Sequence, residues 1–279
     1  MSGFSAHWLS LREGVDHRSR NRDLQAQVCT WLSQIHAPRL TDLGCGSGSN
    51  LRALAPLLPS GQMWRLVDAD PVLLEAAQRL LGDWADEARR DGDSLHLVKS
   101  GKIIQVRFEQ ADLARDLEQV LDRATDLVTA AAFFDLVAAP WLKRFCDAVA
   151  ARQLPFYTVL TYDGIEHWQP AHEADLDVLA AFHAHQATDK GFGPAAGPKA
   201  TGIMEATFKD AGYKASLAQS PWQLEAERDE ALIRALAEGA AQAVAETNRV
   251  VHTTLASWLE ARRLAREVEI GHLDLFARP

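Results

Sequence analysis

A glycine-rich turn near the N-terminus most constrains what this chain can fold into. It reads Asp42-Leu43-Gly44-Cys45-Gly46-Ser47-Gly48 and joins a short strand predicted over 39–43 to a helix predicted over 50–58. Glycines at alternate positions let the backbone turn tightly and approach a ligand closely. The start of the following helix offers free N–H groups to an anionic group. The turn therefore predicts a nucleotide site at the end of the first strand of an α/β sheet.

Strands and helices alternate along the rest of the chain. Apolar runs at 95–98 and 103–108, on either side of Ser100-Gly101-Lys102, predict either a hairpin or one strand with an antiparallel extension. This order is typical of a doubly wound, mostly parallel sheet with helices on both faces, and we expect seven strands with an antiparallel C-terminal strand. The other expected strands are 63–67, 126–130, 156–161, 212–218 and 268–276, and the other expected helices are 16–36, 71–90, 112–121, 140–151, 227–246 and 250–266.

The domain organisation follows from these elements and from the spaces between them. No repeat or low-complexity linker divides the chain, so we expect a single α/β domain over residues 1–279. Three segments should decorate it. They are an N-terminal helical cap over 1–37, a polar insertion or lid on the acceptor side over 163–200, and a helical insertion over 225–266.

Composition and charge exclude several classes of function. The net charge is −9, from 38 acidic and 29 basic residues, and no Lys/Arg cluster is large enough to bind nucleic acid. Cys29, Cys45 and Cys146 form no CxxC pair, so neither a disulfide framework nor a zinc site is indicated. No signal peptide and no apolar run near the ~18 residues of a membrane span are visible. We expect a cytoplasmic protein with a small-molecule substrate, no membrane contact and no metal.

The glycine turn differs from the dinucleotide pattern GxGxxG, because Gly44, Gly46 and Gly48 alternate and Asp42 precedes them. Residues 39–139 resemble the class I (Rossmann-like) S-adenosylmethionine-dependent methyltransferases, whose first motif is an acid followed by GxGxG. The resemblance implies S-adenosyl-L-methionine as cofactor and S-adenosyl-L-homocysteine as product. The methionine part of the cofactor would lie over the backbone of 44–48, near Asp42 and Cys45.

Further cofactor contacts follow from the same resemblance. Asp68 ends the second strand, where the family has an acid that accepts both ribose hydroxyls; Asp70 competes for this role but precedes Pro71 and is better explained as a helix cap. Asp112 matches the acid that binds the adenine amino group, and it also suits an N-cap. The predicted cofactor set is completed by Ala69, Leu113 and Arg20, the last if the first helix covers the site.

The acceptor side is expected beyond the fourth and fifth strands, because open α/β sheets bind ligands at the carboxyl ends of their strands. Polar and ionisable residues are dense after the fifth strand, and the candidates for holding or deprotonating an acceptor are Tyr162, Asp163, His185 and Asp189. Asp163-Gly164 is equally explained as a turn, and His183 and His185 as solvated helix residues. Trp8, Trp168, Phe192 and Trp222 either build an apolar acceptor pocket or pack insertions onto the core.

The sequence therefore favours a methyltransferase that acts on a small-molecule N or O nucleophile. The Asn/Asp-Pro-Pro-Tyr signature of many nucleic-acid amino-methyltransferases is absent after the fourth strand, which reads Ala131-Ala132-Phe133-Phe134-Asp135. Because fold does not fix chemistry, the alternatives are another reaction of the same cofactor (cyclisation, lyase chemistry or aminocarboxypropyl transfer) or a non-catalytic cofactor-binding partner protein. Helices within 225–266 are a candidate surface for a homo-oligomer.

Overall fold

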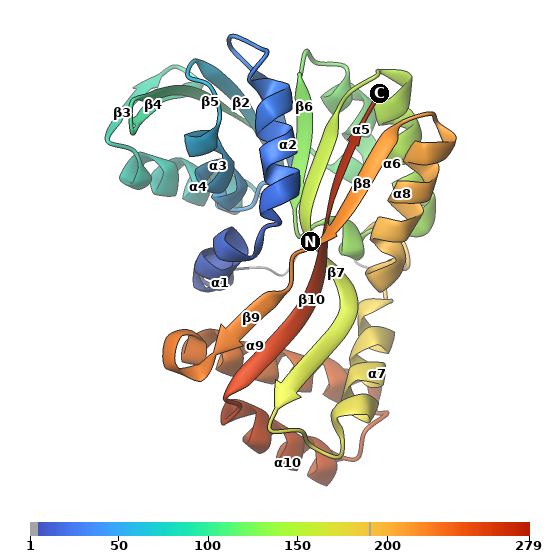
Figure 1. Ribbon diagram of the computed structural model, residues 1–279. Coiled ribbons are helices and arrows are strands. Elements are labelled where there is room, and N and C mark those ends of the chain that lie inside the picture. The colour runs from blue at the N-terminus through green and yellow to red at the C-terminus, as the bar shows by residue number, and fades with distance from the viewer. Residues whose placement is uncertain (1–4, 190) are drawn as a thin grey trace.

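A computed structural model describes residues 5–189 and 191–279, so residues 1–4 of the predicted cap and Lys190 of the predicted lid lie outside it. One mixed sheet forms the centre of the molecule (Figure 1), in the order β3-β4-β5-β2-β1-β6-β7-β10-β8, with β9 paired to β10. The strands are β1 Arg39–Leu43, β2 Gln62–Asp68, β3 Glu87–Asp91, β4 Ser94–Lys99, β5 Lys102–Gln110, β6 Leu127–Ala131, β7 Phe156–Gln169, β8 Lys214–Gln219, β9 Trp222–Glu225 and β10 Glu267–Arg278.

The predicted doubly wound sheet is confirmed. Strands β5, β2, β1, β6 and β7 run parallel, and β10 lies antiparallel between β7 and β8. Strands β3, β4 and β9 extend this seven-stranded centre with antiparallel pairings. One face packs against helices α2 to α4 and the other against α5, α6 and α8. These helices are α2 Arg22–Leu32, α3 Ser49–Leu54, α4 Pro71–Trp84, α5 Leu113–Leu121, α6 Ala139–Ala151 and α8 Ala200–Asp210.

The prediction of one helix over Asp16–His36 is wrong. The segment holds the C-terminal part of α1, Ala6–Ser19, and all of α2, with a joint at Arg20-Asn21. The Asn21 side chain accepts hydrogen bonds from the amides of Asp23 and Leu24, which starts a new helix. The Asn21 amide donates to Asp274 Oδ2 at 2.8 Å, which ties the joint to β10. This joint directs α1 away from α2, across the carboxyl ends of the central strands (Figure 1).

Two other element boundaries differ from prediction. The helix predicted over 71–90 ends at Trp84, because the chain becomes extended at Ala85 and enters β3. All residues of β3 are exposed, so no apolar alternation marks this strand in the sequence. The strand predicted over 156–161 continues to Gln169, because β10 pairs with its outer half from Ile270↔Glu166 to Glu267↔Gln169.

The long strands β7 and β10 carry a second layer of structure, which we call the distal arm (residues 162–186 and 222–272). In Figure 1 it extends from the lower end of the sheet, with β9 beside β10 and three helices around them. The helices are α7 Asp175–Gln186, α9 Ala226–Thr247 and α10 His252–Arg263, and they share a small apolar core of their own. None of the helices in the described parts of the chain is long and apolar enough to span a membrane.

Candidate active site

A cavity of about 530 Å³ opens at the carboxyl ends of β1, β2 and β6. Helix α1 and the segment around Phe192 form its other walls. Its lining comprises Leu9, Arg12, Asp16, Arg20, Asp42, Gly44, Cys45, Gly46, Ser47, Ser49, Asn50, Asp68, Ala69, Leu73, Ala111, Asp112, Leu113, Ala131, Ala132, Phe133, Leu136, Gly191 and Phe192.

The glycine turn has a backbone that only glycine adopts without strain. Gly44, Gly46 and Gly48 have φ of +60°, +52° and +78°. A Cβ at Gly44 would lie 2.8 Å from the Phe133 ring, and one at Gly46 would lie 3.0 Å from Leu9. Gly48 faces α4 instead of the cavity. The turn is therefore shaped to bring backbone atoms close to a ligand.

Asp68 holds this turn in place. Its Oδ2 accepts a hydrogen bond from the Gly46 amide at 2.8 Å, and its Oδ1 accepts one from the Asp70 amide at 3.0 Å. Burial raises the pKa of Asp68. Asp70 instead caps α4, with Oδ1 accepting from the Val72 amide at 2.8 Å. Of the two competing acids, Asp68 is thus the one that faces the cavity.

Asp42 lies fully buried under the turn. Asn50 Nδ2 donates to its Oδ1 at 2.7 Å, and among the described residues its Oδ2 has no hydrogen-bond partner. Burial raises the pKa of Asp42 to about 7, although the Asn50 bond and the Arg20 charge lower it. Arg20 is 4 % exposed and donates from Nη1 to Asn50 Oδ1 at 2.8 Å, while its Nε is unbonded within the same set of residues. A buried cation and a buried acid with spare hydrogen-bonding capacity suit a zwitterionic ligand.

Asp112 closes the third side of the cavity, next to Ala111 and Leu113. Its Oδ1 accepts from the Ala114 amide at 3.0 Å, so the side chain is an N-cap of α5. Its Oδ2 accepts from Arg115 Nε at 3.0 Å. The N-cap explanation is therefore correct for Asp112, and it leaves room for a second contact because a carboxylate oxygen accepts more than one hydrogen bond.

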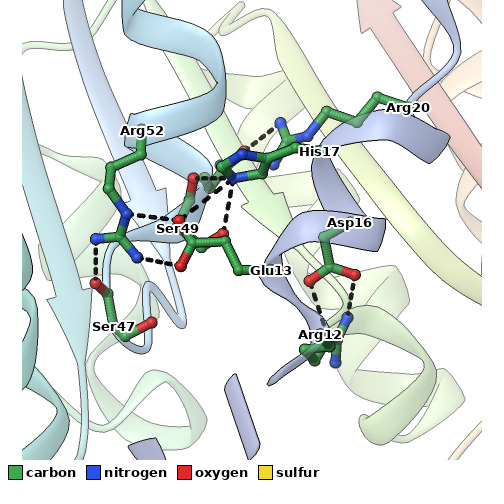
Figure 2. A network of polar contacts seen from close by, with 9 residues as sticks. Arg12, Glu13, Asp16, His17, Arg20, Ser47, Ser49 and Arg52 are labelled. Atoms are coloured by element: carbon green, nitrogen blue, oxygen red, sulfur yellow. Dashed lines mark hydrogen bonds and ion pairs between the residues drawn. The ribbon is translucent and has the colours of Figure 1, made fainter. Parts of the chain in front are cut away.

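Polar contacts fasten α1 over the turn, as Figure 2 shows. Arg52 binds Glu13 with both Nε and Nη2 at 2.6 Å and donates from Nη1 to the Ser47 carbonyl oxygen at 2.8 Å. His17 Nε2 lies 3.0 Å from Ser49 Oγ, and burial together with the Arg20 charge lowers the pKa of this imidazole. We call this set of contacts the α1 latch.

Comparison with known proteins gives a fold and no closer kinship. No family model matches the sequence, and no curated protein matches it. A cyclopropane-fatty-acyl-phospholipid synthase-like protein from Lactobacillus casei is similar in structure, with a TM-score of 0.50, 14 % identity, and coverage of 95 % of this chain and 98 % of that one. The chain has the class I methyltransferase fold.

Two methyltransferase structures resemble the chain more loosely. Magnesium protoporphyrin IX methyltransferase from Synechocystis, solved with bound S-adenosylmethionine, has a TM-score of 0.46 and 11 % identity, over 100 % of this chain and 87 % of that one. A methyltransferase from Thiobacillus denitrificans, solved with S-adenosylhomocysteine, has a TM-score of 0.45 and 16 % identity, over 99 % of both chains.

In this class I methyltransferase fold, the wall beyond the turn is apolar and aromatic. Phe133 follows β6, and its ring lies 5.8 Å from that of Phe192 in an edge-to-face arrangement. Asp189 Oδ1 accepts from the amides of Gly191 and Gly193 at 2.7 and 2.9 Å, which shapes the turn that presents Phe192. Asp189 thus contributes to the cavity through its turn. Sequence reasoning missed Phe133, although it directly follows a predicted strand.

The other predicted catalytic residues do not line the cavity. Tyr162 lies inside β7, and its OH donates to Glu166 Oε1 at 2.9 Å and lies 2.9 Å from His183 Nε2. Asp163 accepts from the Ile165 amide at 3.0 Å, and His185 pairs with Glu246 of α9 at 2.9 Å. The physical reason is the length of β7, which carries residues 162–169 into the distal arm instead of ending at the cavity.

The four predicted aromatic candidates divide in the same way. Phe192 lines the cavity, whereas Trp168 packs against Trp258 in the distal arm at 6.0 Å. Trp8 and Trp222 pack against the core behind the lining residues. Within the described ranges, no group of three His, Cys, Asp or Glu side chains is placed to hold a metal ion.

Proposed function

We propose that this chain is an S-adenosylmethionine-dependent methyltransferase that acts on an N or O nucleophile of a small molecule. One observation carries the proposal. The cavity that the glycine turn lines is also lined by Asp68, Asp112 and the buried residues Arg20 and Asp42, both of which bind Asn50. Together these groups could bind the three parts of one ligand, namely an amino acid, a ribose and an adenine.

The residues fit the cofactor group by group. Arg20 and the amides of the turn would hold the methionine carboxylate, and Asp42 would face its ammonium group. Asp68 would accept the ribose hydroxyls, with Ala69 beside it, and Asp112 with Leu113 would border the adenine. Gly44, Cys45 and Gly46 would bring the backbone close to the cofactor, because a Cβ at Gly44 or Gly46 would fill the space, whereas Gly48 shapes the turn against α4. When bound, the sulfonium group supplies an electrophilic methyl for in-line displacement.

What the protein does in such a reaction is mainly alignment. Phe133, Phe192, Leu9 and Leu136 exclude water from the wall beyond the turn. Tyr162, Asp163, His185 and Asp189 remain our sequence-based proposals for handling an acceptor proton. Of these, Asp189 lies next to the cavity through the turn at 191–193.

Calorimetry on the full chain with S-adenosylmethionine and S-adenosylhomocysteine tests the proposal. We expect both to bind, and Asp68→Asn to weaken binding at least about tenfold because it removes a charged acceptor of hydrogen bonds. Asp70→Asn is the matched control, since Asn also caps helices and Asp70 lies outside the cavity lining. Absence of binding by both compounds would refute the proposal.

Product analysis separates methyl transfer from its alternatives. Incubation of the protein with labelled cofactor and a broad metabolite extract should yield S-adenosylhomocysteine only when extract is present. Methylthioadenosine without S-adenosylhomocysteine would indicate cyclisation or aminocarboxypropyl chemistry. Tight binding with no turnover in any extract would indicate a non-catalytic cofactor-binding protein.

A further inference from the structure

One face of α1 lines the cavity from end to end. Leu9, Arg12, Asp16 and Arg20 follow each other at spacings of three or four residues, which places them on one side of the helix and its C-cap. The two arginines of this stripe have different surroundings. Arg20 lies beside Asn50, under the glycine turn, whereas Arg12 lies beside Trp222 of β9.

The neighbours of Arg12 come from the acceptor side of the molecule. Its guanidinium lies 5.0 Å from the centre of the Trp222 ring of β9. The positive charge of Arg12 also acts on two buried groups. Burial raises the pKa of Asp135, and the Arg12 charge partly opposes this rise. Burial lowers the pKa of His272 to about 3, and the Arg12 charge contributes to this fall. Asp135 follows Phe133 after β6, and His272 lies in β10. Arg12 therefore lies between the cavity and the base of the distal arm.

The Arg12 guanidinium is oriented by Asp16 but still has free N–H donors within the described part of the chain. Its Nε and Nη2 donate to the two carboxylate oxygens of Asp16 at 2.9 and 3.2 Å, and its side chain is 11 % exposed. A guanidinium carries five N–H donors, so three are left, and these have no hydrogen-bond partner among the residues that the structure describes. Asp16 fixes the plane of the group, which leaves those donors for an oxygen-bearing ligand.

The cavity lining holds four aspartates and two arginines, so an anionic ligand is favoured only locally, where the remaining N–H groups of Arg12 and the proposed sulfonium lie. Asp16 neutralises part of the Arg12 charge, and Asp135 makes no hydrogen bond to Arg12. Asp135 instead accepts a long 3.4 Å bond from Gln186 Nε2. The proposed cofactor adds a positive sulfonium, which attracts an anion and repels an amine cation. The remaining walls, formed by Leu9, Leu136, Phe133 and Phe192, suit an apolar or aromatic body.

We propose that the acceptor is a small aromatic or apolar carboxylate, and that Arg12, oriented by Asp16, binds its carboxylate and so determines acceptor specificity. This inference rests on the proposed function for the position of the methyl donor, but the arginine site is a feature of the apoprotein and is testable without the donor. Arg12 is a binding residue here and takes no proton.

Calorimetry on the full chain tests this site with defined probes. Benzoate, 4-hydroxybenzoate and indole-3-acetate are titrated against their neutral amides, with and without saturating S-adenosylhomocysteine. We expect at least one carboxylate to bind about tenfold more tightly than its amide, a difference of about 1.4 kcal/mol, because hydrogen bonds to charged groups are stronger than neutral ones. Arg12→Gln should remove this preference, and Arg12→Lys should keep part of it because the charge remains while the planar fork is lost.

Controls keep the outcome decisive. Arg18→Gln changes an arginine of the same helix that pairs with Asp229 and is absent from the cavity lining, so it should leave carboxylate binding unchanged. Equal binding of carboxylates and amides to the wild-type protein would overturn the proposal, whether or not Arg12→Gln folds. So would preferential binding of benzylamine. If carboxylates bind through Arg12 but neither S-adenosylmethionine nor S-adenosylhomocysteine binds, the proposed function fails while the arginine site stands.

Discussion

The cofactor side of the cavity and the distal arm are built in opposite ways. On the cofactor side, short segments that follow successive strands of the sheet converge, so Asp42, Asp68 and Asp112 meet because parallel strands end at one edge. In the distal arm, β7 and β10 run past that edge and carry helices with a separate apolar core. The sheet therefore fixes one half of the site by its topology, whereas the other half depends on how far β7 and β10 continue.

Substitution of glycine by alanine should have opposite effects in the glycine turn and in the distal arm, and this is the largest difference that we expect. Gly44→Ala should weaken S-adenosylhomocysteine binding about 100-fold and lower the free energy of unfolding by roughly 1–3 kcal/mol, because its φ is +60° and the new Cβ would meet Phe133 at 2.8 Å. Gly239→Ala in α9 should instead stabilise the protein by about 1 kcal/mol, since that Cβ meets nothing within 4 Å. Calorimetry and urea unfolding measure both. Equal effects of the two substitutions would remove the distinction.

The next effect is a difference in pH dependence. Burial raises the pKa of Asp42 to about 7 from 3.8, so the native state keeps a proton that the unfolded chain releases near pH 4. The stability from this protonated group is complete below about pH 4 and is lost as the pH rises through 7. Asp42→Asn should therefore remove this slope and stabilise the apoprotein at pH 8 by a few kcal/mol, while it weakens cofactor binding.

Asp135→Asn gives the matched measurement on the acceptor side. The raised pKa of about 6 at Asp135 predicts a slope of the same sign that ends at lower pH. Thermal unfolding between pH 4 and 8 checks both variants against the wild type. A slope unchanged in Asp42→Asn would show that the buried acid is ionised in the native state throughout this range.

A smaller effect concerns the α1 latch. Glu13→Gln should lower the free energy of unfolding by about 1 kcal/mol and speed S-adenosylhomocysteine release, because it weakens the pair with the nearly buried Arg52. Glu230→Gln in the distal arm breaks the exposed pair with Arg234 and should change stability by less than about 0.5 kcal/mol. Stopped-flow release and urea unfolding distinguish the two, and faster release in Glu230→Gln would contradict the assignment of the latch.

The smallest expected effect is at His185. Its partner Glu246 is 60 % exposed, so His185→Gln should change stability by less than about 0.5 kcal/mol and leave kcat unaltered once an acceptor is known. A fall of kcat by more than about tenfold would instead support the sequence-based proposal that His185 handles the acceptor proton.

The sequence predicts the parallel centre well because its determinants are local. The turn at 42–48, the caps Asp70 and Asp112, and the proline at position 71 each act within a few residues of the element that they begin. The boundary errors have non-local causes. Asn21 is a good cap, but its backbone amide also donates a hydrogen bond to Asp274, which is 253 positions away. Strand β7 continues past residue 161 because β10 pairs with it.

The acceptor wall shows the same limit more strongly. Arg12 and Asp16 stand at helical spacing in the sequence, yet nothing local shows that this face of α1 covers a cavity. Phe192 was among the predicted aromatic candidates, but its place depends on the turn that Asp189 shapes. Conversely, Tyr162 and Asp163 directly follow the predicted end of the fifth strand at residue 161. In the structure they lie within β7, which continues past the cavity to Gln169.

Helix α1 and its C-cap line the whole length of the cavity, from Leu9 to Arg20. The helix and its C-cap place Arg20 beside the glycine turn and Arg12 beside Trp222. The joint at Asn21, which follows the helix, is hydrogen-bonded to Asp274 of β10. A displacement of α1 would move Arg12 and Arg20 together, and it would keep the Arg12–Asp16 pair because both residues of the pair belong to this helix. We therefore expect a ligand bound beside Arg20 to alter binding beside Arg12 through the position of this shared helix.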